Sequence, residues 1–214
     1  MRVGVLGTGD VGKTLGSAFI ALGHEVKMGS RSAAGETASA WARGAGPRAS
    51  AGSFAEAASH GEVVVLATLG VANESVLRAA GPANLAGKLL LDTTNPLDFS
   101  KGFPPRLALA GSDSGGEQVQ RLLPGARVVK VFNTVGHAHM FRPSFPGGPP
   151  DMFICGADEG AKRQVEALLR DFGWGTVDLG GIESSRYLEA MCMVWVLHGA
   201  RSGSWNHAFK LLRK

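Results

Sequence analysis

Residues 1–16 read MRVGVLGTGDVGKTLG, a short apolar run followed at once by closely spaced glycines. Val3, Val5 and Leu6 predict a buried strand, and a helical pattern begins near residue 11. A glycine turn between a strand and a helix lets the backbone approach a dinucleotide pyrophosphate, which the N–H groups of the helix start bind. The predicted turn comprises Gly7, Thr8, Gly9, Asp10, Val11 and Gly12.

The same letters also satisfy the mononucleotide pattern G-x-x-x-x-G-K-[ST], through Gly7, Gly12, Lys13 and Thr14. In that alternative, the run at residues 89–92 (LLLD) would be a strand ending in a magnesium-binding aspartate. Apolar runs ending in Asp are, however, common in α/β proteins, and the first strand already accounts for the glycines. The residues therefore favour a dinucleotide over a P-loop NTPase.

Size and composition are those of a globular α/β protein. The chain has 214 residues, 44% of them hydrophobic, enough for one substantial domain with a small appendage. Its formal charge of +4 is modest, with no basic run interleaved with aromatic residues, which favours an anionic small ligand over nucleic acid. No apolar stretch reaches the roughly 20 residues of a membrane span, and no signal peptide is evident. We expect a cytoplasmic protein with no membrane partner.

The chain has two cysteines, Cys155 and Cys192. They form no CxxC pair, and no His/Cys cluster has metal-ligand spacing. We therefore expect two reduced core residues and no metal site.

Strand and helix patterns alternate through the middle of the chain. Continuous apolar runs at residues 63–68, 89–92 and 128–132 predict strands buried on both faces, as in a parallel sheet. Further strands are expected at residues 25–29, 48–51, 152–155 and 176–179, and helices at residues 11–22, 32–43, 73–80, 114–123 and 159–172, with one more helix that Ser53 could cap. This order predicts an α/β fold with a doubly wound, mainly parallel Rossmann sheet.

Residues 184–214 predict two helices with a break near residues 199–203. The first carries a stripe of apolar, aromatic and histidine side chains, typical of a helix face in a core: Tyr187, Leu188, Met191, Val194, Trp195 and His198. We expect a dinucleotide-binding domain at residues 1–180 and a small helical domain at residues 181–214.

The second strand ends in Gly29, Ser30 and Arg31, where a protein specific for NAD would place an acidic residue to bind the adenosine ribose. A hydroxyl and a guanidinium instead offer hydrogen-bond donors to a 2′-phosphate. These residues therefore predict NADP rather than NAD. The alternative is that Ser30 caps the next helix and Arg31 is a solvated first-turn residue.

In a doubly wound sheet, the nicotinamide lies beyond the carboxyl ends of the strands after the switch point. Three loops with small polar side chains and exposed backbone follow such strand ends. Their candidate binding residues are Thr68, Leu69, Gly70, Asn95, Pro96 and Asn133. For Asn95 and Pro96 the alternative is an ordinary turn, which Asn-Pro favours.

His137 and His139 follow the last of these loops and are weak candidates for a catalytic role. Either could donate to a reduced flavin-like ring or act as a general acid. The alternative is that one packs and the other is solvated. Because hydride transfer between two aligned rings needs mainly proximity and orientation, no catalytic residue is assigned.

The segments GTGDVG, LGHEVKMGSR, LLLDTTNPL and VVKVFNT, with a late block from residue 184 to the C-terminus, resemble the NADP oxidoreductases that depend on coenzyme F420. Relatives of that family include the cytosolic domains of six-transmembrane ferric reductases. The resemblance implies NADP binding by Thr8, Gly9, Asp10, Val11, Ser30 and Arg31. Some members carry a second basic residue four positions beyond the arginine, where this chain has Gly35.

The resemblance also implies a second redox partner, F420 or a flavin such as FMN or FAD. It implies a C-terminal domain that covers the nicotinamide, and a homodimer. The expected function is hydride transfer between NADP(H) and such a small-molecule carrier. The alternatives are a non-catalytic NADP-binding sensor or regulatory module and, with less support, the NTPase. The residues after Gly180 are too few for the substrate domain of hydroxyacid or pyrroline-carboxylate reductases.

Overall fold

A computed structural model describes all 214 residues, and its main feature is an eight-stranded sheet in the order β10-β9-β8-β5-β4-β1-β2-β3. All neighbouring strands are parallel except β8 and β9, so the predicted doubly wound, mainly parallel sheet is confirmed. The strands are β1 (Arg2–Leu6), β2 (Glu25–Ser30), β3 (Ala49–Ser53), β4 (Val63–Leu66), β5 (Leu89–Asp92), β8 (Arg127–Lys130), β9 (Asp151–Gly156) and β10 (Gly175–Asp178). A separate antiparallel pair, β6 (Leu97–Asp98) and β7 (Arg106–Leu107), follows β5.

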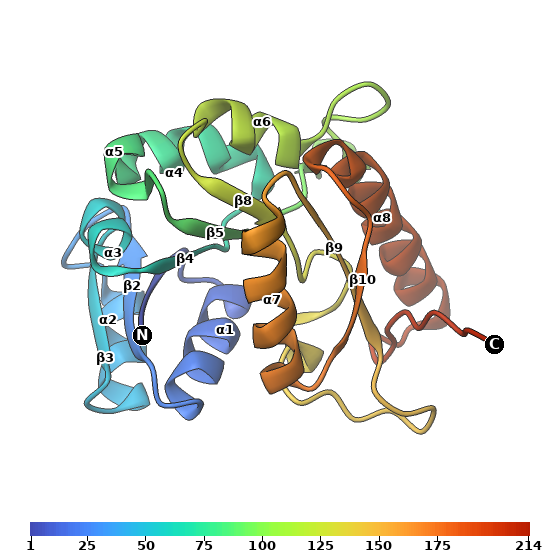
Figure 1. Cartoon of the computed structure of the whole chain (residues 1–214), viewed down its shortest axis with the longest axis horizontal. Helices are drawn as coiled ribbons and strands as arrows, with labels where there is room; N and C mark the ends of the chain where they lie inside the picture. The colour runs from blue at the N-terminus through green and yellow to red at the C-terminus, as the bar shows by residue number, and fades with distance from the viewer.

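Helices cover both faces of the sheet (Figure 1). They are α1 (Asp10–Ala21), α2 (Glu36–Ala45), α3 (Phe54–His60), α4 (Asn73–Ala80), α5 (Pro82–Leu85), α6 (Gly115–Leu122), α7 (Glu159–Phe172) and α8 (Ser185–Ser202). Buried side chains of α1, α2 and α7 form one core, and those of α3, α4, α5 and α6 form another. Three short 3₁₀ turns lie at Gly70–Ala72, His137–His139 and Ile182–Ser184.

The two cores follow from the pleat of the central strands. Val63 and Val65 belong to the first core, while Val64 and Leu66 belong to the second. Successive strand side chains point to opposite faces, so a continuous apolar run is what a strand covered on both sides requires. The predicted capping of α3 is also confirmed, because the Ser53 hydroxyl accepts from the Glu56 backbone N–H and the Glu56 carboxylate accepts from that of Ser53.

The prediction of a second late helix is wrong. Helix α8 ends at Ser202, followed by Gly203 in the left-handed conformation (φ 67°), and residues 204–214 form neither helix nor strand. This tail bonds to the start of β9: Asp151 N–H donates to the Phe209 carbonyl (3.0 Å), and the Asp151 carboxylate accepts from Leu211 N–H (2.8 Å). His207 therefore lies in the tail rather than on a helix, with its ring stacked on Trp195.

The expected core stripe on α8 is only partly core. Leu188 is buried, but Tyr187 and Val194 are 69% and 57% exposed, and His198 is exposed as well. Helix α8 turns a different side inward, comprising Ser185, Leu188, Glu189, Cys192, Val196 and Gly199. An apolar stripe indicates a contact surface, but its spacing alone does not say whether the contact is within the chain.

Cys155 and Cys192 are buried and unpaired, as expected, and burial raises the pKa of each thiol to about 12. No group of three or more His, Cys, Asp or Glu side chains is arranged to hold a metal ion. None of the helices combines the length and apolar character needed to cross a bilayer.

Substitution of Phe172 tests the aromatic packing of the first core. The centre of its ring lies 5.2 Å from that of Phe19, 5.6 Å from that of Phe132 and 5.2 Å from that of Phe141. Phe172→Ala removes a fully buried ring and should lower the free energy of unfolding in urea by about 3–5 kcal/mol. Phe99→Ala is the control, since Phe99 is 51% exposed; its effect should stay within about 0.5 kcal/mol. Equal losses for the two variants would contradict this packing.

Candidate functional site

The turn after β1 is packed tightly on one side and open on the other. Gly7 has φ 130°, and a side chain there would lie 2.2 Å from the Ala67 carbonyl oxygen. A side chain at Gly12 would lie 2.3 Å from the Gly7 carbonyl oxygen, whereas at Gly9 it would meet no atom within 4 Å. The first and third glycines therefore allow the close packing of strand, turn and helix, and Gly9 leaves the outer side of the turn free.

Helix α1 starts directly after this turn, with Gly9 as its N-cap and no side chain capping it. The Gly9 carbonyl accepts from Lys13 N–H (2.9 Å), so the backbone N–H groups of the first turn are left for an anion. Lys13 and Thr14 lie within the helix and do not line the cavity described below. Asp92 is fully buried and paired with Lys130 (2.7 Å). The residues of the mononucleotide alternative, Lys13 and Thr14 for the phosphates and Asp92 for the magnesium ion, therefore do not meet at one site.

A cavity of about 1140 Å³ runs past the carboxyl ends of β1, β2, β4 and β5. It brings together most of the residues predicted from sequence: Gly7, Thr8, Gly9, Asp10, Val11, Ser30, Arg31, Thr68, Leu69, Gly70, Asn95 and His137. Segments separated by up to 130 positions thus meet at one edge of the sheet, where parallel strands place their ligand-binding loops.

Four predicted residues do not line the cavity: Gly12, Pro96, Asn133 and His139. Gly12 lies beneath the turn, and Pro96 lies behind Gly70, where a side chain would be 2.7 Å from the Pro96 nitrogen. Asn133 is 3% exposed, and its amide is used within the protein. The His139 ring is 3.2 Å from the Asn206 side chain and packs on Phe145, so it is held by the tail.

At the β2 end, the Ser30 hydroxyl donates to the Ser32 carbonyl (2.5 Å). Ser30 does not cap α2, whose N-cap is Gly35 and has no side-chain cap, so the capping alternative is wrong. A side chain at Gly35 would lie 2.3 Å from the Ser30 hydroxyl oxygen, which leaves no room for a second basic residue. Arg31 is the one Lys or Arg that lines the cavity, beside Glu36, which pairs with Arg43 (2.7 Å).

Sequence reasoning missed one wall of the cavity. Its residues lie in the loop before α2, at the start of α2, at the start of α3, at the end of the 3₁₀ turn before α4 and on one face of α4: Ser32, Glu36, Thr37, Ala38, Phe54, Ala72, Ser75, Val76 and Ala79. Thr93, Thr94 and Leu97 add to the wall near Asn95. The spacing at 72, 75, 76 and 79 is that of one helical face, so a helix-face analysis of α4 could have found it.

The inner end of the cavity is backed by a buried hydrogen-bond chain. The Thr68 hydroxyl donates to the Asn73 side-chain oxygen (3.1 Å), and the Asn73 amide donates to the Thr94 hydroxyl (2.7 Å). The Thr94 hydroxyl and N–H donate to Asp92 Oδ1 (2.7 and 3.0 Å). The loops after β4 and β5 are thus held in register with each other.

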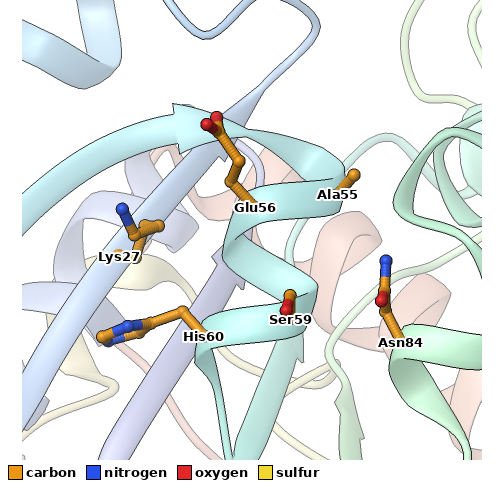
Figure 2. Close-up of a pocket in the computed structure, with 6 residues that line it drawn as sticks. All are labelled: Lys27, Ala55, Glu56, Ser59, His60 and Asn84. Atoms are coloured by element: carbon orange, nitrogen blue, oxygen red, sulfur yellow. The ribbon is translucent and has the colours of Figure 1, made fainter.

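A second depression, of about 520 Å³, lies over β2, α3 and α5 and shares no residue with the cavity (Figure 2). Its main polar groups already have structural roles, since Glu56 belongs to the α3 cap and the Asn84 amide donates to the Ala80 carbonyl (2.8 Å). Burial, together with nearby Lys27 and Arg2, lowers the pKa of His60. This depression therefore has the chemistry of a helix cap rather than of a ligand site.

The chain is similar to known proteins both over the glycine turn and over its full length. Residues 2–96 match the family model of the coenzyme F420-dependent NADP oxidoreductases. The crystal structure of a candidate F420-dependent NADP-reductase from Arthrobacter sp. FB24 is 40% identical in sequence and superposes with a TM-score of 0.94, covering 100% of both chains.

Two other relatives are more distant. Metalloreductase STEAP3 of Rattus norvegicus is 31% identical over 199 residues, which are 89% of this chain and 36% of that protein, so the chain spans about a third of this curated relative. A reductive aminase from Aspergillus terreus, solved with NADPH and ethyl levulinate, has a TM-score of 0.67 at 21% identity. The match covers 94% of this chain and 62% of that chain, and it shows the fold alone. The full-length match to the Arthrobacter structure, together with the family model over the glycine turn, shows that this chain belongs to the coenzyme F420-dependent NADP oxidoreductase family.

Proposed function

We propose that the protein binds NADP(H) along this cavity and exchanges a hydride with a deazaflavin or flavin-like carrier, coenzyme F420 being the best candidate. The observation that carries the proposal is the continuity of the cavity. It joins the Ser30 and Arg31 end to the loops after β4 and β5, with the open side of the Gly9 turn between them. This arrangement suits a dinucleotide bound across the strand ends.

In this proposal each part of the cofactor meets a suitable surface. The pyrophosphate lies on the N–H groups at the start of α1, which also favour its negative charge. Arg31 and Ser30 bind the 2′-phosphate, and the α4 face with Phe54 receives the adenine. The nicotinamide end lies against Thr68, Thr94 and Asn95, where a carboxamide finds hydrogen-bonding groups.

The carrier would approach from the apolar surface beside this end. Leu69 lines the cavity and is 69% exposed, and the neighbouring 3₁₀ turn exposes Val71. Phe103, from the loop between β6 and β7, is exposed and packs edge-on against Trp205. Large exposed apolar side chains near a cavity are typical of a binding surface, and a flat ring system suits them.

The residues at this end need only orient the two rings. When bound, the nicotinamide supplies or accepts the hydride at its C4 position, and the carrier gains or loses one proton. His137 lines the cavity and remains a weak candidate for handling that proton, whereas His139 is turned to the tail. Orientation and exclusion of water are the contributions expected from the other residues.

None of residues 181–214 lines the cavity in a single copy of the chain, so the expected cover over the nicotinamide end has no support there. We also propose that the exposed side of α8 is a homodimer contact. Tyr187, Val194 and Leu197 are exposed on that helix, and a second copy would bury them. Light scattering should report a dimer, and Val194→Asp should shift it toward monomer. A wild-type monomer at micromolar concentration would contradict this proposal.

The function is tested by titration with NADPH, NADH and Mg-ATP, followed by stopped-flow mixing of the NADPH complex with F420, FMN and FAD. We expect tight NADPH binding and oxidation of the nicotinamide by F420. Binding of ATP without NADPH would overturn the proposal. NADPH binding without oxidation by any carrier would support the sensor alternative instead.

Gly9→Ala tests the pyrophosphate turn. The new methyl group meets no atom within 4 Å, and the backbone at φ −74° accepts any residue, so the melting temperature should not change. The methyl group would stand where the pyrophosphate lies, so we expect NADPH affinity to fall at least about tenfold. In Gly12→Ala, by contrast, the methyl group meets the Gly7 carbonyl, so the fold itself should lose stability. Unchanged NADPH affinity in Gly9→Ala would place the cofactor elsewhere.

Arg31→Ala tests the preference for NADP. Removing the guanidinium should weaken NADPH by about tenfold or more and NADH much less, because only NADPH carries the 2′-phosphate. Arg48→Ala is the control, since Arg48 is exposed, forms no ion pair and does not line the cavity, so neither affinity should change. Equal losses of NADPH and NADH affinity in Arg31→Ala would reject the 2′-phosphate role.

A further inference from the structure

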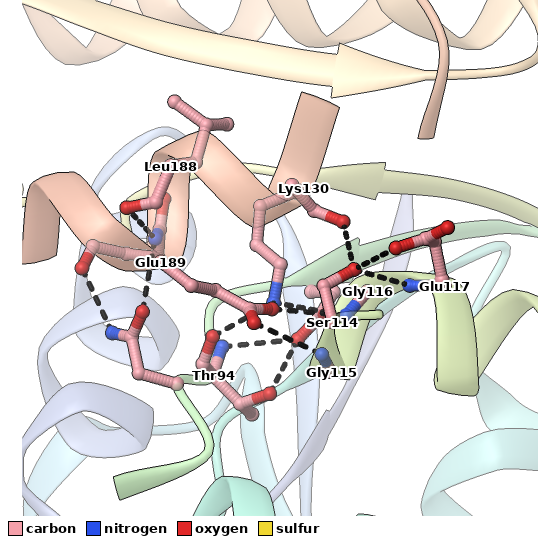
Figure 3. A network of polar contacts seen from close by, with 12 residues as sticks. Thr94, Ser114, Gly115, Gly116, Glu117, Lys130, Leu188 and Glu189 are labelled. Carbon is pink, nitrogen blue, oxygen red and sulfur yellow. Dashed lines mark hydrogen bonds and ion pairs between the residues drawn. The ribbon is translucent and has the colours of Figure 1, made fainter. Parts of the chain in front are cut away.

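Three charged side chains are buried together behind the cavity. Lys130 Nζ lies 2.7 Å from Asp92 Oδ2 and 2.9 Å from Glu189 Oε1, and none of the three side chains is more than 1% exposed (Figure 3). Desolvation lowers the pKa of Lys130, but the two carboxylates outweigh it and raise that pKa above its ordinary value. Buried ion pairs add little net stability over apolar packing, so this cluster calls for another role.

Glu189 connects α8 to the start of α6. Its two carboxylate oxygens accept from the backbone N–H groups of Gly115 (2.9 Å) and Gly116 (3.0 Å). A side chain at Gly116 would lie 2.6 Å from the Ser185 hydroxyl oxygen, so glycine is needed for this close approach. The N–H groups balance the excess negative charge of two carboxylates facing one ammonium.

The cluster also fixes the loop after β5. Lys130 Nζ donates to the Thr94 carbonyl (2.8 Å). The next residue, Asn95, exchanges hydrogen bonds with Asn133: the Asn133 amide donates to Asn95 Oδ1 (2.9 Å), and the Asn95 amide donates to the Asn133 carbonyl (2.8 Å). The same Asn133 amide donates to the Leu188 carbonyl (2.9 Å).

Two consecutive residues of α8, Leu188 and Glu189, therefore hold two consecutive residues of the loop, Thr94 and Asn95. Each link passes through one buried side chain at the end of β8, either Lys130, its last residue, or Asn133, three positions later. Thr94 and Asn95 line the cavity, whereas Lys130, Asn133 and Glu189 do not. The links thus act from behind the cavity wall.

We propose that Glu189 and Lys130 are positioning residues that fix the Thr94–Asn95 wall for the nicotinamide half of the cofactor. This inference rests on the proposed function, because it assumes that NADP(H) binds in the cavity. It gives α8 a role in the cofactor site that needs no direct contact between α8 and the cofactor. The adenosine half is assigned to Ser30, Arg31 and the α4 face formed by Ser75, Val76 and Ala79, and none of these residues bonds to the cluster.

The test compares NADP⁺ with adenosine 2′,5′-bisphosphate, which carries the 2′-phosphate but lacks the nicotinamide half. In Glu189→Gln, one amide N–H₂ would face a donor, so the links to Lys130 and Gly115 cannot all persist. We expect calorimetry to show NADP⁺ affinity lowered about tenfold and the affinity of the bisphosphate unchanged. Equal loss of both affinities, or loss of neither, would overturn the positioning role.

Arg186→Gln is the matched control. Arg186 is on the same helix and pairs with Glu117 of α6, but it has no link to the Thr94–Asn95 wall. Both affinities should stay at the wild-type level in this variant, and a selective loss of NADP⁺ there would contradict the inference. If Glu189→Gln does not fold, Glu189→Asp replaces it: it keeps the charge but shortens the reach, and the same selective loss is expected. Wild-type protein that binds neither ligand would overturn the proposed function itself.

Discussion

The ammonium group of Lys130 holds the sheet and the last helix together. It lies between the carboxylates of Asp92 and Glu189, which come from β5 and α8, and it donates to the Thr94 carbonyl. Removing one partner of such a buried group leaves an uncompensated charge, at a cost of about 3–5 kcal/mol. The end of β5, the start of α6 and the first turns of α8 can therefore shift only together, and the loop that forms the inner cavity wall is fixed with them.

The outer part of the cavity depends on a different constraint, the absence of side chains. Gly7 and Gly12 have backbone oxygens about 2.2 and 2.3 Å from where their side chains would begin, so strand, turn and helix pack with nothing between them. At Gly35, too, a side chain would begin 2.3 Å from the Ser30 hydroxyl oxygen, so glycine allows these two residues to lie close together. The cofactor cavity thus has a close-packed glycine turn at its centre and a charged, hydrogen-bonded wall at its inner end. One part gives room to the phosphates, and the other gives a fixed surface to the ring.

The corrections to the sequence analysis share one cause. The sequence predicts a helix over the tail, but Trp205 and His207 pack on Trp195 and Phe209 bonds to the start of β9, so the tail forms no helix. Tyr187 and Val194 follow a helical stripe but face away from the core. Asn133 was expected at the ligand, yet its amide is occupied by Asn95 and Leu188. In each case a pattern along the chain predicted a contact but not the partner.

The sequence by itself determined the glycine turn, the alternation of strands and helices in the main sheet, and the Ser30–Arg31 pair at the end of β2. These features depend on neighbouring residues, because a strand, a turn or a helix start is formed within a few positions of the chain. Only the tertiary structure decided which face of α4 lines the cavity, and that Asp92 faces Lys130 rather than a metal ion. The tertiary structure also brings Glu189 to Gly115, 74 positions away in the chain. Such a contact depends on how the helices and strands pack and not on the neighbouring residues in the sequence.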